Sequence, residues 1–456
     1  MSAENTAVYD FDLITIGAGS GGVAASRYAA AQGVRVAICE ADRVGGTCVI
    51  RGCIPKKIFM YAAQFAESFA DAPAYGWAAA THAFEMERLT GAKNAETERL
   101  EGIYRRMLSS SGVRLFAGRA QVADAHTVVV DGQRLSAGRI LVATGAATAR
   151  PPIPGIELAL TSTELLDLRE LPHRLLVLGS GYIALEFASI FRGLGSEVSL
   201  AFRAEAPLRG FDQDLRTRSA TALRERGIDL RPGFKFARLE RQAGGIVCHG
   251  ADGQAVEADV VLNAMGRLPN SAGLGLEALG VKLDPGSGAV CVDAYSRSSV
   301  DSIFAVGDVT DRLALTPVAI AEGRAFVDTE FRGKPRRIDH STVASAVFCL
   351  PPVACIGLTE AAARERGLRT TVFEADFRPM KNVISGRADR SYMKLVVDAA
   401  SDRVLGVHML GVDAPEIVQS LAVAVTMGAT KQQFDATMAM HPTAAEEFML
   451  MRTPRA

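Results

Sequence analysis

The stretch Phe11-Asp12-Leu13-Ile14-Thr15-Ile16-Gly17-Ala18-Gly19-Ser20-Gly21-Gly22 decides the fold of this chain. Its apolar half is typical of a buried parallel strand, and its Gly-x-Gly-x-x-Gly half predicts a turn into a helix that runs to about Gln32. The next predicted strand, Val34–Glu40, ends on an acid. In such a unit the loop amides and the helix N-terminus hold a pyrophosphate, and the acid binds a ribose hydroxyl. We therefore predict a site for an adenine dinucleotide with a free 2′-hydroxyl.

A second unit of this kind follows, so the chain contains one internal duplication. The strand Arg174–Leu178 precedes the loop Gly179-Ser180-Gly181-Tyr182-Ile183-Ala184, and a second strand is predicted over Glu197–Phe202. That strand ends without an acid, and Arg203 and Arg209 follow it. Two arginines in this place indicate a 2′-phosphate, hence NADP(H) rather than NAD(H). The alternative is a pair of solvated arginines on a surface loop.

Two thiols lie in the segment Gly45–Lys57, shortly after the first glycine-rich loop. In a regular helix the Cα atoms of Cys48 and Cys53 would be about 8 Å apart, whereas a disulfide needs less than about 7 Å. The pair can therefore close only if the chain is distorted, which Gly52 and Pro55 permit. The alternative is two free, buried cysteines. Three basic side chains nearby are expected to favour the thiolate over the thiol: Arg51, Lys56 and Lys57.

Length and composition limit the number of domains and the classes of protein to which this chain can belong. At 456 residues we expect two to four domains of roughly 100–200 residues each. A hydrophobic content of 48% with 43 glycines fits an α/β protein, and a net charge of −1 gives no reason to expect nucleic acid or an anionic membrane surface. No apolar run reaches the length of about 18 residues that a bilayer requires, and Met1–Asp12 lacks an export signal. Seven cysteines argue against a secreted scaffold. We expect a cytoplasmic protein with one redox-active pair and no metal site.

The rest of the chain predicts further elements in three regions. The first should contain helices over 58–70 and 87–111 and short strands over 127–130 and 139–143. Strands over 259–264 and 303–306 close the second region. From about residue 346 the third region has strands over 369–376, 392–398 and 403–410 before a helix from Ala414, without a glycine-rich loop, and reads as α+β.

Two further motifs carry functional chemistry. Val306-Gly307-Asp308 predicts a strand, a glycine and an acid able to reach a flavin ribityl or phosphate group; alternatively Asp308 caps the helix after Thr316. His441 could protonate a leaving thiolate, with Glu446 holding its tautomer, although a lone histidine is more often structural. Two dinucleotide sites and a dithiol in one chain indicate an electron relay in which NADPH reduces a flavin and the flavin reduces the disulfide.

Together these residues closely resemble the flavoprotein disulfide reductases, and within them the glutathione-reducing branch. The resemblance covers nearly the whole chain, with the motifs in the family's order: Gly45–Lys57, Ala143–Gly145, Gly179–Glu186, Ala264–Asn270, Val306–Asp308, Leu315–Ala319 and His441–Glu447. It implies an α/β fold with two Rossmann-like dinucleotide-binding domains, for FAD and NADPH, and a C-terminal α+β dimerisation domain. The implied segments are 1–158 (FAD), 159–288 (NADPH), 289–345 (second FAD or central segment) and 346–456 (dimerisation).

The resemblance also implies the role of each catalytic residue. Cys53 corresponds to the thiol beside the flavin, and Cys48 to the interchange thiol that attacks the substrate disulfide. His441, supported by Glu446, corresponds to an acid–base residue lent by the partner subunit of a homodimer. An ion pair near the flavin's reactive nitrogen corresponds to Lys56 and Glu186. Tyr182 matches an aromatic gate that NADPH displaces, and Arg203 and Arg209 match the 2′-phosphate clamp.

Cofactor and substrate contacts follow from the same resemblance. The implied FAD contacts are Gly17, Gly19, Ser20, Gly21, Gly22, Glu40, Gly46, Thr47, Cys48, Lys56, Ala120, Thr144, Gly145, Gly307, Asp308, Thr316 and His441. The implied NADPH contacts are Gly179, Ser180, Gly181, Tyr182, Ile183, Glu186, Arg203, Arg209, Gly266, Arg267 and Ala314. The implied contacts to glutathione disulfide are Ser20, Arg27, Tyr104 and Arg324.

Substrate choice is expected to depend on two arginines. Arg27 and Arg324 stand where glutathione-reducing relatives bind glutathione carboxylates, whereas trypanothione reductases have apolar residues there and an acid near Ala24. Lipoamide dehydrogenases usually have an acid where Arg203 stands. We therefore expect NADPH-dependent reduction of glutathione disulfide. The alternatives are another small disulfide, trypanothione-like or lipoamide-like, or a flavin-binding protein without catalysis. Two departures from the family stand out: the segment Cys349-Leu350-Pro351-Pro352, followed by Cys355, and Tyr28 in place of a second arginine.

Overall fold

A computed structural model describes residues 9–455, which group into two compact units. Among these residues, unit 1 comprises 9–56, 91–149 and 267–340, and unit 2 comprises 57–90, 150–266 and 341–455. Most of the N-terminal stretch in which we predict no export signal, residues 1–8, lies outside the described residues. Within them, no helix has the length and apolarity needed to span a bilayer. The four predicted domain segments stay a prediction.

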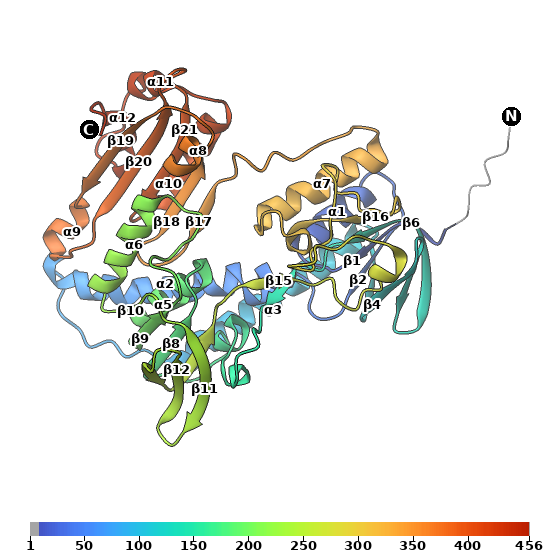
Figure 1. Cartoon of the computed structure of the whole chain (residues 1–456), viewed down its shortest axis with the longest axis horizontal. Helices are drawn as coiled ribbons and strands as arrows, with labels where there is room; N and C mark the ends of the chain where they lie inside the picture. Colours follow the sequence, from blue (N-terminus) through green and yellow to red (C-terminus); the bar gives the residue numbers. More distant parts are fainter. Residues whose placement is uncertain (1–8, 456) are drawn as a thin grey trace. The chain divides into compact units, whose positions relative to one another are not determined.

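Unit 1 is built on one sheet whose strands follow the order β3-β2-β1-β6-β5-β4, with β16 also paired to β6. The strands are β1 (Phe11–Ile16), β2 (Val36–Glu40), β3 (Arg114–Ala117), β4 (Ala120–Asp124), β5 (Thr127–Val130), β6 (Gln133–Val142) and β16 (Ile303–Ala305). β3, β2, β1, β6 and β16 run parallel, so their carboxyl ends share one edge. Helices α1 (Ser20–Ala30) and α7 (Thr316–Arg332) lie side by side against this layer (Figure 1). The predicted first strand is confirmed, whereas the expected 139–143 strand begins earlier, at Gln133.

Unit 2 contains the second parallel sheet, in the order β10-β9-β8-β14. Its strands are β8 (Arg174–Leu178), β9 (Glu197–Ala201), β10 (Asp229–Arg231) and β14 (Val260–Asn263), and its helices are α5 (Tyr182–Leu194) and α6 (Gln213–Glu225). The duplicated strand–loop–helix pattern is therefore present. An antiparallel sheet was not predicted: β11 (Phe236–Gln242), β12 (Gly245–Gly250) and β13 (Ala255–Ala258).

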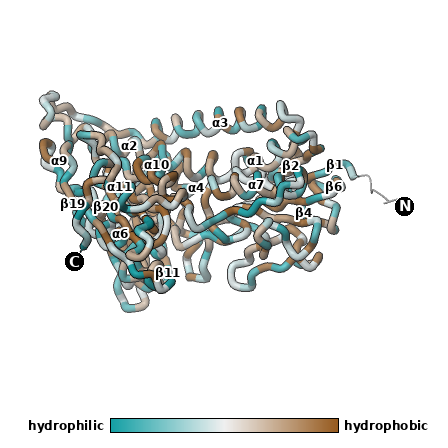
Figure 2. The backbone as a smooth tube through the Cα atoms, turned by 90° about the horizontal axis from the view of Figure 1, so that it is seen from above, coloured by the Kyte–Doolittle hydropathy of each residue, from teal (hydrophilic) through white to brown (hydrophobic). Residues whose placement is uncertain are grey.

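The C-terminal part of unit 2 is a five-stranded antiparallel sheet, in the order β17-β18-β21-β20-β19, with helices. Its strands are β17 (Ser345–Val347), β18 (Val353–Gly357), β19 (Thr370–Phe377), β20 (Ser391–Asp398) and β21 (Val404–Leu410). This arrangement confirms the predicted α+β region. Helix α10 (Ala414–Thr426) is coloured mostly as hydrophobic in Figure 2. Large apolar side chains nearby in the sequence are exposed, including Val423 (63%), Met427 (81%) and Met438 (94%), which is typical of an interaction surface.

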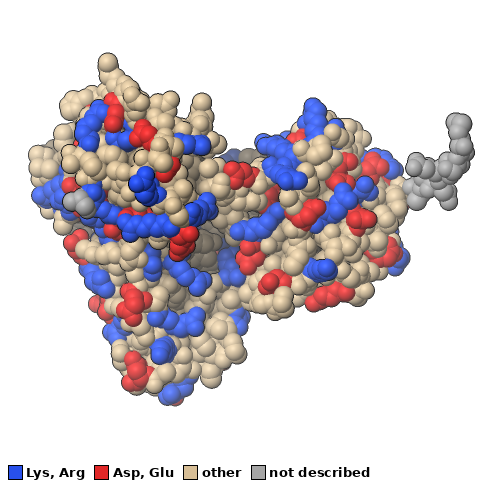
Figure 3. Space-filling model, turned by 45° about the horizontal axis from the view of Figure 1, so that its top comes forward, with Lys and Arg blue, Asp and Glu red and all other residues tan. Residues whose placement is uncertain are grey.

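Helices α2 (Cys53–Asp71) and α3 (Met86–Ser110) each contain residues of both units. The shorter elements are α4 (Ser162–Leu165), α8 (Glu360–Glu365), α9 (Met380–Ser385), α11 (Lys431–Ala436), α12 (Glu447–Leu450), β7 (Ala146–Thr148) and β15 (Arg267–Pro269). On the face that Figure 3 shows, basic and acidic side chains are interspersed, in keeping with the net charge of −1.

Candidate active site

The first glycine-rich loop has the shape of a pyrophosphate cradle. Gly17 has φ +104°, and a Cβ at Gly22 would lie 1.9 Å from the Gly17 carbonyl oxygen. A Cβ at Gly46 would lie 2.6 Å from the Gly19 Cα, so two glycine segments touch at this point. At the end of β2, Glu40 accepts hydrogen bonds from the backbone amides of Ala18 (2.7 Å) and Asp42 (2.9 Å). Bare amides at the start of α1 and a carboxylate fixed beside them fit the adenosine diphosphate part of FAD.

The acid of Val306-Gly307-Asp308 follows β16 in a short 3₁₀ turn, Gly307–Thr310. Burial raises the pKa of the Asp308 carboxyl, which Arg267 opposes. Helix α7 begins at Thr316 without a side-chain cap, so the alternative that Asp308 caps this helix is wrong. Asp308 instead lies at the carboxyl edge of the parallel sheet, where nucleotides bind in such folds.

A buried carboxylate that we did not predict supports this turn. Glu322, on α7, is 1% exposed and accepts a 2.8 Å hydrogen bond from the Gly307 amide. Its other oxygen lies 2.9 Å from the Arg312 guanidinium and 2.8 Å from Nε2 of His340. Periodicity places Glu322 on a helix but does not show that its side chain turns inward, so the sequence carries no signal for this role.

Other predicted contacts also belong to unit 1. Thr144 Oγ1 donates a hydrogen bond to the backbone carbonyl of Asn270 (2.7 Å), and the backbone amide of Asn270 donates one to the carbonyl of Gly145 (2.9 Å). Arg267, predicted to contact NADPH, donates to the Ala146 carbonyl and lies 3.9 Å from Asp308. Ala120 is buried at the start of β4, whereas Ala314 is exposed just before α7.

The dithiol segment is distorted as its spacing requires. Thr47–Arg51 forms a π-helical turn, Gly52 has φ −136° and ψ −111°, and α2 begins at Cys53. A Cβ at Gly52 would lie 2.8 Å from the Thr47 carbonyl oxygen, so this tight passage requires glycine. The distorted turn brings the Cys48 and Cys53 side chains within interaction range of each other.

We expect Gly52→Ala to be costly because the added methyl group would meet fixed backbone. The overpacking should cost about 1–3 kcal/mol, seen as a lower thermal unfolding midpoint. Gly91→Ala is the matched control, since Gly91 is an exposed position of α3 where an added methyl group would meet nothing within 4 Å. There alanine should gain up to about 1 kcal/mol of helix propensity. Equal midpoints for the two variants would contradict the requirement at Gly52.

The pKa of the Cys48 thiol differs from our expectation that basic neighbours favour the thiolate. The neighbouring Cys53 sulfur and burial raise the pKa of the Cys48 thiol, while the Thr316 and Ser20 hydroxyls oppose the shift. Two of the three basic side chains are engaged elsewhere: Arg51 pairs with Asp42, and Lys57 lies 3.9 Å from Glu416. The pKa of the Cys48 thiol is therefore raised, whereas the basic side chains nearby led us to expect a lowered one.

Two predicted substrate residues, Ser20 and Tyr104, interact with Cys48. The Ser20 hydroxyl lowers the pKa of the Cys48 thiol. Burial raises the pKa of Tyr104, as does Cys48, whereas Arg27 lowers it. Arg27 donates from Nε to the Ser111 hydroxyl (3.3 Å), and Arg324 is exposed on α7.

The side chain of Tyr28, one of the two departures from the family, is held by other side chains of the protein. Its hydroxyl donates to Asp328 (2.9 Å) and accepts from Arg332, and both partners lie on α7. The side chain therefore ties α1 to α7 where some relatives have a second arginine.

The second glycine-rich loop, in unit 2, repeats the cradle. Gly179 has φ +133°, and a Cβ there would lie 2.2 Å from the Ala264 carbonyl oxygen. A Cβ at Gly181 would meet nothing within 4 Å, so there is open space beside the chain at the start of α5. Tyr182 is 43% exposed beside it, and Arg203 and Arg209 are both exposed after β9. An open glycine loop at a helix N-terminus, followed by two exposed cations, fits a phosphorylated dinucleotide.

The remaining catalytic candidates are held by different units. Lys56 is 8% exposed at the end of a unit 1 segment, and Glu186 is 2% exposed in unit 2, so their ion pair stays a prediction. Glu186 accepts a 2.9 Å hydrogen bond from the Phe348 amide. Next to Phe348, the buried Cys349 thiol donates to the Pro351 carbonyl (3.1 Å), which gives this departure from the family a packing role.

His441 and Glu446 form a pair in unit 2. Nδ1 of His441 lies 3.1 and 3.3 Å from the two Glu446 carboxylate oxygens. The Glu446 side chain is 11% exposed, whereas that of His441 is 82% exposed. A carboxylate on Nδ1 leaves Nε2 as the nitrogen that can exchange a proton with an external group.

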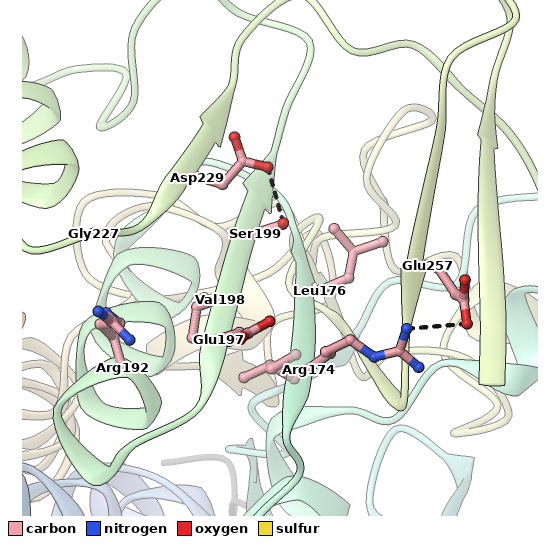
Figure 4. Close-up of a pocket in the computed structure, with 10 residues that line it drawn as sticks. Arg174, Leu176, Arg192, Glu197, Val198, Ser199, Gly227, Asp229 and Glu257 are labelled. Carbon is pink, nitrogen blue, oxygen red and sulfur yellow. Dashed lines mark hydrogen bonds and ion pairs between the residues drawn. The ribbon is translucent and has the colours of Figure 1, made fainter. Parts of the chain in front are cut away.

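A pocket in unit 2 lies away from these groups. It is formed around Arg174 and Glu197, which begin β8 and β9, at the opposite ends of these strands from the Gly179 loop (Figure 4). Its polar groups pair with one another: Arg174 with Glu257 (3.0 Å) and Ser199 with Asp229 (3.1 Å). Because nucleotides bind at the carboxyl ends of such strands, we do not assign a cofactor to it.

Comparison with known proteins defines the class. A model of the pyridine nucleotide-disulphide oxidoreductase family matches residues 11–323, and a model of that family's dimerisation domain matches residues 343–452. The chain belongs to this family, whose cofactors here are FAD and NADPH.

Among its relatives, a glutathione reductase of Burkholderia cepacia is 50% identical over 98% of this chain and 99% of its own length. A glutathione reductase of Nostoc sp. is 46% identical over 97% and 100%, and a trypanothione reductase of Leishmania donovani is 38% identical over 97% and 96%. A solved structure, the HOCl-induced flavoprotein disulfide reductase RclA from Escherichia coli, matches with a TM-score of 0.88 and 29% identity over 97% of this chain and 99% of that one.

Proposed function

We propose that this chain is an NADPH-dependent glutathione reductase that acts as a homodimer. The observation that carries the proposal is the Cys48–Cys53 pair, which a distorted turn holds and whose Cys48 interacts with Ser20 and Tyr104. The two dinucleotide cradles and the similarity to glutathione reductases over nearly the whole length support the same reading. The dimerisation region and the relatives support the homodimer.

The chemistry of the thiols follows from this arrangement. FAD, when bound, takes up the two electrons of NADPH and passes them to the Cys48–Cys53 disulfide. The Cys48 thiolate then attacks one sulfur of glutathione disulfide, which forms a mixed disulfide and releases one glutathione thiolate. The Cys53 thiolate attacks the Cys48 sulfur, which releases the second glutathione and restores the disulfide. In total, one NADPH and one proton reduce one glutathione disulfide to two glutathione molecules.

Proton transfer is assigned to His441. With Glu446 on Nδ1, Nε2 can accept the proton of Cys48 before the attack and then protonate the leaving glutathione thiolate. The raised pKa of Cys48 in the dithiol explains why it needs such a base before it attacks. We infer that the His441 of each site comes from the partner subunit, because its side chain is exposed within one chain and lies in the dimerisation region.

The choice of glutathione disulfide is supported by two cations on the neighbouring helices α1 and α7, Arg27 and Arg324. Their positive charge suits the carboxylates of glutathione, whereas trypanothione reductases have apolar residues at these positions. The test is oxidation of NADPH by the purified protein with the disulfides of glutathione, trypanothione, lipoamide and coenzyme A. Glutathione disulfide should give the highest kcat/KM. A higher value for another disulfide would overturn the substrate assignment, and a yellow protein without turnover would favour a non-catalytic role.

NADPH should be preferred to NADH by at least about a hundredfold in kcat/KM, because two charge-assisted arginine–phosphate contacts each contribute about 1.5–3 kcal/mol. Arg203→Glu combined with Arg209→Leu should abolish this preference. Steady-state kinetics with both cofactors measures it, and retained NADH turnover serves as the internal control for folding. Equal use of the two cofactors by the unmodified enzyme would contradict the assignment of the clamp.

We also infer a cytoplasmic location. The chain has seven cysteines, an odd and low count for its length, which suits a reducing compartment better than a secreted disulfide scaffold.

A further inference from the structure

The two arginines assigned to the 2′-phosphate flank a turn that is itself buried. Pro207 and Leu208 are buried, whereas Arg203 and Arg209 on either side are exposed. The turn is fixed to the glycine-rich loop by a 2.8 Å hydrogen bond from the Leu208 amide to the Ser180 carbonyl. Leu208 has φ +55°, a left-handed conformation that a leucine holds only when surrounding contacts impose it.

Arg216 supplies such contacts from helix α6. Its Nε donates to the Pro207 carbonyl (2.8 Å) and its Nη2 to the Ala206 carbonyl (3.0 Å). The third nitrogen, Nη1, donates to Gln213 Oε1 (2.9 Å), one turn earlier on the helix. The planar guanidinium thus binds two successive carbonyls between Arg203 and Arg209. A lysine, with a single nitrogen on a flexible stem, does not reproduce this fork.

Helix α6 is a rigid support for this fork because its N-terminus is anchored. Asp212, the N-cap, accepts from the Asp214 amide (3.1 Å). The same carboxylate accepts from the Glu360 amide (3.1 Å) and from Nζ of Lys394 (2.9 Å). The Lys394 side chain is 1% exposed. A buried cluster of charged side chains therefore fixes the start of the helix. Because Arg216 lies on this fixed helix, its two hydrogen bonds to backbone carbonyls restrain the turn.

We propose that Arg216 is a positioning residue for recognition of the 2′-phosphate: it holds the turn 204–208 so that Arg203 and Arg209 converge on one phosphate without touching it itself. The proposal rests on the proposed function, in which these two arginines form the clamp. It predicts a much larger effect on ligands that carry the 2′-phosphate than on ligands that lack it, because the turn contacts the pyrophosphate cradle through the hydrogen bond from the Leu208 amide to the Ser180 carbonyl, whereas it carries both clamp arginines on its flanks.

The test is calorimetric titration of the purified, FAD-containing protein with adenosine 2′,5′-bisphosphate and, separately, with ADP. Arg216→Lys keeps the charge and removes the fork, and Arg216→Gln removes both. Arg224→Gln is the matched control, because Arg224 is an exposed arginine in the last turn of the same helix. Arg209→Leu tests the clamp itself. NADPH and NADH kinetics accompany each titration.

Arg216→Lys and Arg216→Gln should both weaken binding of the bisphosphate about tenfold, because a turn without the fork holds the two clamp arginines less firmly, and should change ADP binding less than about twofold. Arg224→Gln should change neither. If Arg216→Lys binds the bisphosphate as the parent does, or if ADP binding falls equally, the inference is overturned. If Arg209→Leu leaves bisphosphate binding unchanged, the clamp assigned under the proposed function is wrong. Should Arg216→Gln fail to fold, Arg216→Lys alone decides.

Discussion

Replacing Cys48 by serine is expected to lower turnover of glutathione disulfide by at least about 10³-fold. A serine oxygen cannot form the mixed disulfide, so no electrons reach the substrate. Cys53 remains beside the flavin, and reduction by NADPH should therefore still produce a long-wavelength charge-transfer absorbance. Cys53→Ser should lose both the turnover and this absorbance. Anaerobic titration with NADPH, followed by absorbance spectroscopy, measures the difference.

The matched control is Cys291→Ser, because Cys291 is an exposed free thiol of the same unit outside the proposed site. It should retain both activity and absorbance. If Cys53→Ser keeps the long-wavelength absorbance and Cys48→Ser loses it, the roles of the two thiols are reversed. That result would leave the dithiol mechanism in place but overturn the order of attack.

Replacing His441 by glutamine should lower turnover about 10²–10⁴-fold, the usual contribution of general acid–base catalysis. The glutamine cannot exchange a proton with the leaving thiolate. Reduction of the enzyme by NADPH should be unaffected, because that half of the reaction does not require this proton. Rapid-mixing kinetics separates the two halves. His173→Gln, at a side chain 74% exposed in the same unit, is the control and should leave both rates unchanged.

Mixing the two inactive variants tests whether the site is shared. Cys48→Ser and His441→Gln subunits, dissociated and reassociated together, should form heterodimers in which one site carries both defects and the other carries neither. Activity should therefore return with the heterodimer fraction. If heterodimers form and stay inactive, His441 serves its own chain or has no catalytic role.

The parts of the fold that could be predicted are those with a strong local pattern. Phe11–Ile16 and Arg174–Leu178 are apolar runs that end in glycine loops, and both strands have the predicted bounds. Strand β11 was missed because Leu239 is its one buried residue, so hydrophobic alternation carries no signal. Strand β6 begins earlier than predicted because its first residues, from Gln133, are polar and exposed.

The candidate site also has features that could be predicted from the sequence and features that could not. The spacing of Cys48 and Cys53 required a distorted chain, and the π-helical turn supplies it. The raised pKa of Cys48 could not be predicted, because it depends on the neighbouring Cys53 side chain and on burial in the folded chain. Glu322 and Arg216 could not be predicted either. A charged residue in a helix is usually solvated, and only the folded chain brings the Gly307 amide or the turn carbonyls to these side chains.

The pairing of β16 with β6 has a consequence for how the protein is made. Residues 140–142 of β6 are fully buried beside residues 303–305 of β16. On a ribosome the first strand emerges long before the second, and at about 5–20 residues per second the wait is on the order of ten to thirty seconds. During that time an apolar strand edge is open to pairing with another nascent chain. Chaperone capacity and translation speed should therefore limit the yield of this protein more than the stability of its finished fold.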